Sequence, residues 1–204
     1  MTICLVTDRR RRPPVEQARE AAEAGVDIIQ VRERDLDARA LCALVQDVVR
    51  VTRGSRARVV VNDRLDVALA AGADGVHLRG DSIPPARARS LAPAGFLLGA
   101  SVRTEAEAVE AARWCDYLVA GTVFPTNSKP GMTAFLGLAG LASIAKAVSV
   151  PVLAIGGVSV DRAADVAAAG GGGVAAIGLF ADPDRPIKEV VNRINIGGKI
   201  SPRP

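Results

Sequence analysis

The stretch RVVVNDRLDVALAAGADGVHL, residues 58–78, contains two apolar runs separated by a helical segment. The first run is continuously apolar rather than alternating, which is typical of a strand buried on both faces of a parallel sheet. The helical segment ends at Gly72, a residue type that adopts the left-handed conformation at least cost. GVHL then begins a new strand, so the stretch predicts one β/α repeat and the start of the next.

The same repeat recurs along the chain roughly every 20 to 25 residues. Asp37, Thr104 and Asp161 precede helical segments and are predicted to cap them. We predict strands at residues 2–8, 27–32, 58–63, 75–78, 96–101, 117–121, 151–157 and 173–178, and helices at residues 14–24, 37–52, 64–72, 84–92, 104–114, 137–148, 160–169 and 183–193.

Eight such repeats predict an α/β protein with a closed (β/α)8 TIM barrel. The barrel is expected to form a single domain over residues 1–196, followed by a loose C-terminal tail at residues 197–204. An open doubly wound sheet is the alternative. That fold rarely needs eight repeats, and no GxGxxG motif follows the first predicted strand.

The composition limits the classes of partner. Hydrophobic residues make up 49% of the 204 residues and aromatic residues only 3%, so Ala, Val, Leu and Ile must build the core. The net charge is +4, and we interpret the basic run Arg9, Arg10, Arg11 and Arg12 as a solvated loop. Because aromatic residues are so few, nucleic acid is disfavoured as a partner. Phosphorylated small molecules are the expected partners.

The cysteines and the lack of long apolar segments indicate the compartment. Cys4, Cys42 and Cys115 form no CxxC pair, which indicates packing residues in a reduced, cytoplasmic protein. With one histidine in the chain, Cys and His imply no metal site. No apolar segment reaches the ~18 residues of a membrane span, so no membrane partner is expected. The oligomeric state is open, with a homo-oligomer among the options.

Polar residues and glycines stand where the predicted strands end. In a TIM barrel the active site lies at the carboxyl ends of the strands, so we expect these residues to share one site. In strand order they are Gln30, Arg32 and Arg34; Asn62 and Asp63; His77, Arg79 and Asp81; Ser101; Thr122, Thr126, Ser128 and Lys129; Gly156 and Gly157; and Ile177 and Gly178.

Several of these residues are suited to phosphate. Small residues in the turns that end at Gly157 and Gly178 would let backbone N–H groups approach phosphate oxygens, although ordinary turns are the alternative. The segment TNSK, residues 126–129, offers hydroxyls and an ammonium, or is a solvated connection. Arg32 lies in an apolar run, so it is predicted to point into the barrel mouth and, with Arg34, to contact a diphosphate.

Two residues have competing interpretations. Asp63 is a candidate Mg²⁺ ligand, because Mg²⁺ favours a few carboxylates together with phosphate oxygens and water. Asn62 and Asp63 are also suited to cap the following helix. His77 is interpreted as a structural histidine rather than a catalytic one.

Five segments of the chain carry a recognisable pattern. They are IIQVRERD at residues 28–35, VVVNDRLDVALAAGADGVHL at 59–78, GASVRTEAEA at 99–108, DYLVAGTVFPTNSKPG at 116–131 and PVLAIGGVSVDRAADVAAAGGGGVAAIG at 151–178. In this order they resemble the thiamine phosphate synthase family and its TenI-like relatives, and the resemblance covers nearly the whole chain. It implies a TIM barrel that condenses 4-amino-5-hydroxymethyl-2-methylpyrimidine diphosphate with 4-methyl-5-(2-hydroxyethyl)thiazole phosphate, giving thiamine phosphate and pyrophosphate with Mg²⁺.

The resemblance also implies roles for individual residues. Arg32, Ser101 and Lys129 would be the catalytic residues. Asp63 would bind Mg²⁺. The substrate-binding residues would be Gln30, Arg32, Arg34 and Asn62 for the pyrimidine diphosphate, Ser101 for the pyrimidine or pyrophosphate, Thr126, Ser128 and Lys129 for the thiazole partner and pyrophosphate, and Gly157, Ile177 and Gly178 for the thiazole phosphate.

The sequence departs from the family pattern at several of these positions. In HLRGDS, residues 77–82, Ser82 stands where the family has its second metal-binding carboxylate, and the adjacent Asp81 is the predicted substitute ligand. Arg34 replaces a lysine, and Gly178 replaces a serine. Thr122 stands where TenI-like isomerases have a histidine. A functioning synthase is favoured; the alternatives are a TenI-like thiazole-phosphate isomerase and a non-catalytic phosphate-binding regulatory protein.

Overall fold

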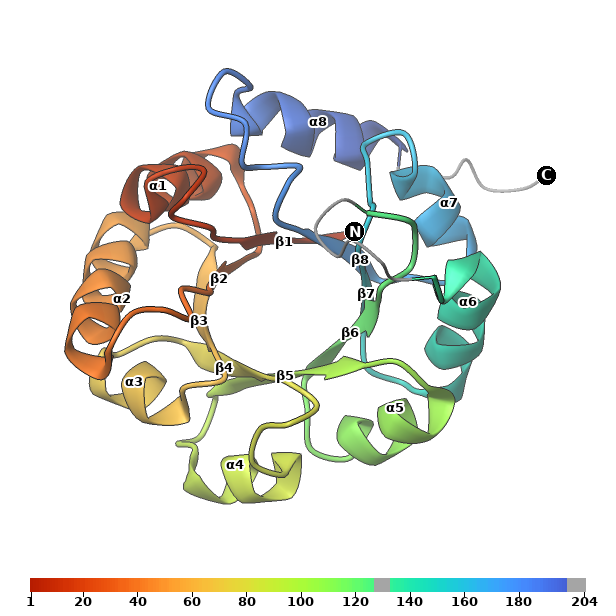
Figure 1. Ribbon diagram of the computed structural model, residues 1–204, viewed down its shortest axis with the longest axis horizontal. Helices are drawn as coiled ribbons and strands as arrows, with labels where there is room; N and C mark the ends of the chain where they lie inside the picture. The colour runs from red at the N-terminus through yellow and green to blue at the C-terminus, as the bar shows by residue number, and fades with distance from the viewer. Residues whose placement is uncertain (127–132, 198–204) are drawn as a thin grey trace.

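A computed structural model describes residues 1–126 and 133–197 of the chain as a closed barrel of eight parallel strands surrounded by helices (Figure 1). Each strand pairs with the next in sequence, and β8 returns to pair with β1. The predicted TIM barrel is therefore confirmed. The strands are β1 (Thr2–Val6), β2 (Ile28–Val31), β3 (Arg58–Asn62), β4 (Gly75–Leu78), β5 (Leu97–Val102), β6 (Tyr117–Gly121), β7 (Val152–Ile155) and β8 (Gly173–Ala176).

The helices alternate with the strands and form the outer layer of the barrel (Figure 1). None of the described helices is long and apolar enough to cross a membrane. They are α1 (Pro14–Ala24), α2 (Ala38–Thr52), α3 (Leu65–Ala70), α4 (Pro85–Leu91), α5 (Glu105–Ala112), α6 (Gly137–Ala147), α7 (Ala163–Ala168) and α8 (Ile187–Gly197).

The core has two parts, because strand side chains alternate between the two faces of the barrel wall. The larger part lies between the strands and the helices and is mostly aliphatic. The smaller part fills the barrel interior and includes Cys4, whose pKa is raised to about 12 by burial. Tyr117 contributes the large side chain of this inner layer, and its pKa is also raised by burial.

The predicted capping residues differ in outcome. Asp37 accepts a hydrogen bond from the backbone N–H of Ala40, and Thr104 forms a capping box with Glu107. The prediction for Asp161 is wrong, because α7 begins two residues later and its N-terminus has no side-chain cap. Asp161 instead pairs with Arg193 at 3.0 Å. Sequence spacing located this helix but not its first residue.

Gly99 on β5 leaves the space that Tyr117 occupies. A Cβ built at Gly99 would lie 2.1 Å from the Cζ of Tyr117, closer than any real contact. Both residues lie on adjacent, paired strands, so neither backbone can move without disturbing the barrel. The tyrosine in the barrel interior therefore depends on a glycine opposite it.

We predict that Gly99→Ala lowers the free energy of unfolding by about 1–3 kcal/mol, because the added methyl group overpacks the barrel interior. Urea denaturation at neutral pH measures the change. Gly80→Ala is the matched control, since a Cβ there meets nothing within 4 Å. Equal stability of the two variants would contradict this account of the inner layer.

Candidate functional site

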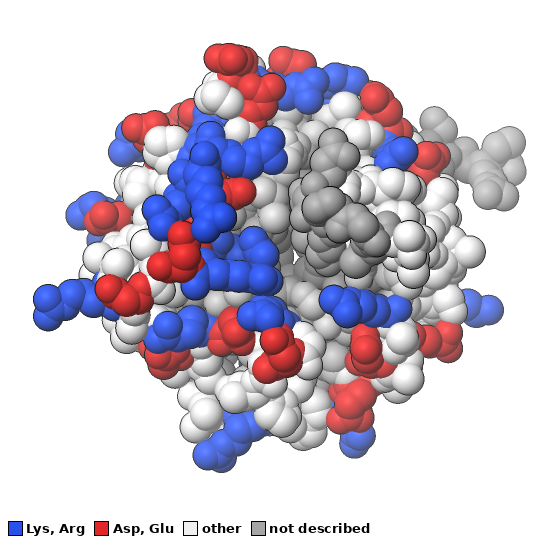
Figure 2. Space-filling model, viewed as in Figure 1, with Lys and Arg blue, Asp and Glu red and all other residues white. Residues whose placement is uncertain are grey.

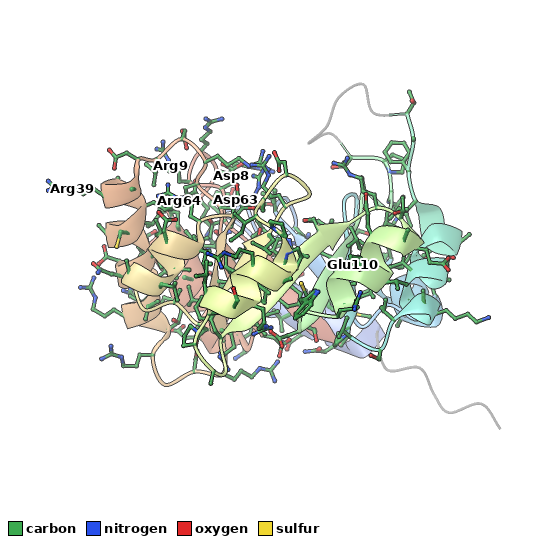
Figure 3. The ribbon with its side chains drawn as sticks, turned by 90° about the horizontal axis from the view of Figure 1, so that it is seen from below. Asp8, Arg9, Arg39, Asp63, Arg64 and Glu110 are labelled. Atoms are coloured by element: carbon green, nitrogen blue, oxygen red, sulfur yellow. The ribbon has the colours of Figure 1, made fainter. Side chains whose placement is uncertain are left out.

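The carboxyl ends of the eight strands meet at one end of the barrel, which we call the carboxyl rim. Asp8, Arg9, Asp63 and Arg64 all lie at this end (Figure 3). A cavity of about 630 Å³, here named the central cavity, opens there. Its lining includes the predicted site residues Gln30, Arg32, Arg34, Asn62, His77, Asp81, Ser101 and Ile177, together with Arg79 and Arg103.

Two smaller pockets adjoin the central cavity. A pocket of about 130 Å³, the side pocket, is lined by Asp63, Arg34 and Arg79 among others. A pocket of about 230 Å³, the glycine pocket, contains the predicted residues Thr126, Gly157, Ile177 and Gly178 in its lining. The predicted residues therefore converge on one rim, except that Ser128 and Lys129 lie outside the described residues.

His77 on β4 lies within a chain of hydrogen bonds beneath the cavity. Its Nδ1 lies 3.1 Å from the Tyr117 hydroxyl and its Nε2 lies 2.9 Å from the Ser101 Oγ. The residue is 3% exposed, and burial lowers the pKa of its imidazole to about 4. A neutral imidazole with both nitrogens bonded orients Ser101 toward the cavity, in agreement with the structural interpretation of this histidine.

Arginines provide positive charge on one side of the cavity. Arg32 and Arg34 follow β2, and neither guanidinium forms an ion pair within residues 1–126 and 133–195. Burial lowers the pKa of Arg32, and the charge of Arg34 lowers it further. Figure 2 shows Lys and Arg side chains gathered over this side of the barrel mouth. A bound polyanion would relieve the mutual repulsion of these guanidinium groups.

Asp63 follows β3 in a left-handed backbone conformation, with φ of 67°. This conformation is uncommon for a residue other than glycine. Its carboxylate accepts hydrogen bonds from the Ser82 hydroxyl and from Arg79 Nη1, the latter at 3.4 Å. The alternative that Asp63 caps α3 is not borne out, because α3 has no side-chain cap. Its carboxylate faces the side pocket instead.

The residues at this point suit a magnesium ion only in part. In the described part of the chain, no three His, Cys, Asp or Glu side chains lie close enough together to hold a metal. Asp63 and Asp81 are both paired with Arg79. Mg²⁺ keeps several waters and commonly uses one or two carboxylates plus phosphate oxygens. The donor set fits an ion that arrives with a diphosphate.

The glycine pocket is built by close backbone packing. Gly156 and Gly157 both have positive φ, and a Cβ on Gly157 would lie 2.3 Å from the carbonyl oxygen of Pro125. Phe124 N–H donates to the Gly156 carbonyl at 3.0 Å, which extends the β6–β7 pairing beyond the strands. The start of the β6–α6 loop is therefore held against the β7–α7 turn.

Backbone donors remain available in this pocket. Within the described ranges, no carbonyl accepts from the N–H groups of Gly157, Gly178 or Leu179. Donors of this kind, after the seventh and eighth strands of a barrel, form the usual phosphate site of the fold. The predicted phosphate-binding turns are thus open to a ligand, and the missing serine hydroxyl at Gly178 leaves the N–H in place.

The basic run after β1 is more structured than expected. Arg9 and Arg10 both pair with Asp35, at 2.7 and 3.1 Å. Arg12 is buried and pairs with Glu20 at 2.5 Å, so the prediction of a solvated loop is wrong for this residue. Arg11 is exposed, and its Nη1 would lie 3.4 Å from a Cβ on Gly178. The loop after β1 therefore reaches the loop after β8.

Sequence reasoning missed two contributors to the site and the contacts of a third. Arg79 was expected at the site but not as the partner of both candidate metal ligands. Arg103, which follows β5, lines the central cavity. Tyr117 has no sequence feature that distinguishes it from other strand residues, yet its hydroxyl forms a hydrogen bond with the His77 imidazole. The short motif HLRGDS was the only sequence signal for Arg79, and its pairing with Asp63, which follows the neighbouring strand β3, could not be inferred from spacing.

The fold and the cavity together define a TIM-barrel protein with an arginine-lined cavity at the carboxyl rim. The chain belongs to the thiamine monophosphate synthase family, whose model matches residues 3–180. The thiamine-phosphate synthase of Methanoculleus marisnigri is 46% identical over 177 residues, covering 85% of this chain and 84% of that protein. The thiamine-phosphate synthase of Pyrococcus abyssi is 40% identical, covering 87% and 85%.

Solved structures agree with this assignment. Thiamine phosphate pyrophosphorylase from Pyrococcus furiosus superposes with a TM-score of 0.86 at 36% identity, covering 97% of this chain and 95% of that one. A 3-hexulose-6-phosphate synthase superposes with a TM-score of 0.73 at 21% identity, which shows a shared fold alone.

The buried His77 makes stability depend on pH. Its pKa is about 4 in the folded protein against 6.5 in the unfolded chain, so the folded state resists protonation. We predict that the free energy of unfolding falls by about 3 kcal/mol as the pH drops from 6.5 to 4, with no further loss from this group below that range.

Denaturation at a series of pH values measures this loss, and His77→Gln is the comparison. The variant cannot take up the proton, so its stability should decline less over the same interval, whatever its absolute value. Parallel curves for the two proteins would show that His77 is not the group responsible.

Proposed function

We propose that this chain is a thiamine-phosphate synthase. It would join the pyrimidine diphosphate to the thiazole phosphate and release pyrophosphate, in thiamine biosynthesis. Family membership and relatives that carry this name at 40–46% identity support the activity. The observation that carries the assignment is the pair of anion-binding features at one rim: the arginines around the central cavity and the open N–H groups of the glycine pocket.

Two phosphorylated substrates require two such features at a suitable separation. Ile155, Ala175 and Ile177 line both the central cavity and the glycine pocket, so the two spaces adjoin each other. These apolar side chains would pack against the two heterocycles. Polar groups of Gln30 and Asn62 reach the same cavity and would hydrogen-bond to the pyrimidine.

The chemistry is a substitution at the methylene carbon of the pyrimidine. The carbon–oxygen bond breaks, the electron pair leaves with pyrophosphate, and the thiazole nitrogen donates its own pair to the same carbon. Arg32 and Arg34 would stabilise the charge that develops on the leaving group. Ser101, oriented by His77, would bind the pyrimidine or the departing pyrophosphate. The ring nitrogen needs no general base.

Asp63 is the residue that would hold Mg²⁺ with the diphosphate, and Asp81 is the second candidate ligand. The ion, when bound, would neutralise charge on the leaving pyrophosphate. On the other side of the cavity, Gly157, Ile177 and Gly178 would bind the thiazole phosphate through backbone N–H groups. Thr126, Ser128 and Lys129 would complete the site. For Ser128 and Lys129 only the sequence motif supports this role, because both lie outside the described residues.

The first test mixes the protein with both substrates and Mg²⁺ and follows thiamine phosphate and pyrophosphate. Equal amounts of the two products are expected. Binding of the thiazole phosphate without any product would reject the synthase and favour the TenI-like or regulatory alternatives. The TenI-like isomerase lacks its expected histidine here, since Thr122 occupies that position.

The second test removes charge from the cavity. Arg32→Ala is expected to lower kcat/KM about 100-fold or more, because a preorganised cation no longer faces the leaving group. Arg39→Ala is the matched control, since Arg39 points outward from α2 (Figure 3) and should leave the rate unchanged. Similar rates for both variants would place the reacting diphosphate elsewhere.

A further inference from the structure

Arg79 lies between two carboxylates at the edge of the proposed diphosphate site. It follows β4, and its side chain is about one-third exposed, at 32%. Nη1 lies 3.4 Å from Asp63 Oδ2, and Nη2 lies 2.6 Å from Asp81 Oδ2. The guanidinium thus neutralises both residues that would otherwise be the candidate metal ligands.

Ser82 forms hydrogen bonds with both Arg79 and Asp63. The Arg79 backbone N–H donates to Ser82 Oγ at 2.7 Å, and the Ser82 hydroxyl donates to Asp63 Oδ1. Both oxygens of the Asp63 carboxylate therefore have a partner within the protein. A divalent cation that took Asp63 would have to displace the guanidinium, because two cations repel strongly at this distance.

Arg79 also borders both spaces in which a diphosphate would lie. It lines the central cavity and the side pocket, and Arg34 lines both as well. Its charge is among those that lower the pKa of Arg32. A small rotation of the side chain, away from Asp63, would direct a bidentate donor at phosphate oxygens, for which the guanidinium geometry is suited.

We propose that Arg79 exchanges partners when substrate binds. In the free protein it pairs with Asp63 and Asp81 and competes with free divalent cations. Asp63 would hold a cation that accompanies the diphosphate, and Arg79 would then turn to the phosphate oxygens. Arg79 is then a substrate-binding residue that also prevents the protein from taking the metal first. This inference rests on the proposed function for the identity of the diphosphate.

The test measures binding without turnover. Mn²⁺ is titrated into the protein alone by isothermal titration calorimetry, and pyrophosphate is then titrated in the presence of Mg²⁺. Arg79→Ala should bind Mn²⁺ about 10-fold more tightly than the unchanged protein, since the competing guanidinium is gone. The same variant should bind pyrophosphate about 10-fold more weakly. Unchanged Mn²⁺ affinity would overturn the proposal.

Arg103→Ala is the matched control. Arg103 lines the same cavity and carries the same charge, but it forms no ion pair with Asp63 or Asp81. Its removal should leave Mn²⁺ affinity close to that of the unchanged protein. An equal gain in both variants would indicate a general charge effect and reject the specific role of Arg79.

Arg79→Gln covers the case in which Arg79→Ala does not fold. Glutamine keeps part of the side-chain length but removes the charge, so Mn²⁺ should bind more tightly than to the unchanged protein, and no gain would overturn the proposal. The outcome is independent of the synthase assay. A protein that makes no thiamine phosphate could still show competition between Mn²⁺ and Arg79. Conversely, an active synthase could show no such competition, and the proposal would then be overturned while the proposed function stands.

Discussion

Hydrogen bonding between β1 and β8 closes the sheet, and the site depends on this closure. The register pairs Thr2 with Gly173 and Leu5 with Ala176, and a Cβ on Gly173 would lie 2.2 Å from the Thr2 carbonyl oxygen. Because all eight strands run parallel, closure brings every carboxyl end to one rim. The loop after β1 consequently lies beside the loop after β8, although about 170 residues of sequence separate them.

The arginines at that rim differ in whether a carboxylate pairs with them. Arg9, Arg10 and Arg12 are paired with carboxylates, whereas Arg32 and Arg34 have no such partner in the described ranges. Guanidinium groups that face one cavity without carboxylate partners repel each other. An anion in the cavity would offset this repulsion. The same residue type is therefore held in ion pairs on one loop and faces a cavity on the next.

Much of the architecture could be predicted, because each β/α repeat carries its own local signals. Continuous apolar runs located the eight strands, and α1 begins and ends where the sequence predicted. The wrong predictions concern side chains that could form a hydrogen bond or ion pair with more than one partner. Asp161 has the chemistry of a cap but pairs with Arg193, and Asp63 has the chemistry of a cap but pairs with Arg79 and Ser82. Local propensity does not decide between a neighbouring N–H and a cation on another loop.

The sequence by itself determined the repeat, the barrel and the set of polar residues that stand at the strand ends, since periodicity and strand-end position are local properties of the chain. Only the tertiary structure decided that His77 is held between Tyr117 and Ser101, and that Arg79 bridges Asp63 and Asp81. The physical reason is that the contacts of His77 and the Arg79–Asp63 ion pair join different β/α units. Their distances depend on the register and closure of the whole barrel, which no single segment encodes.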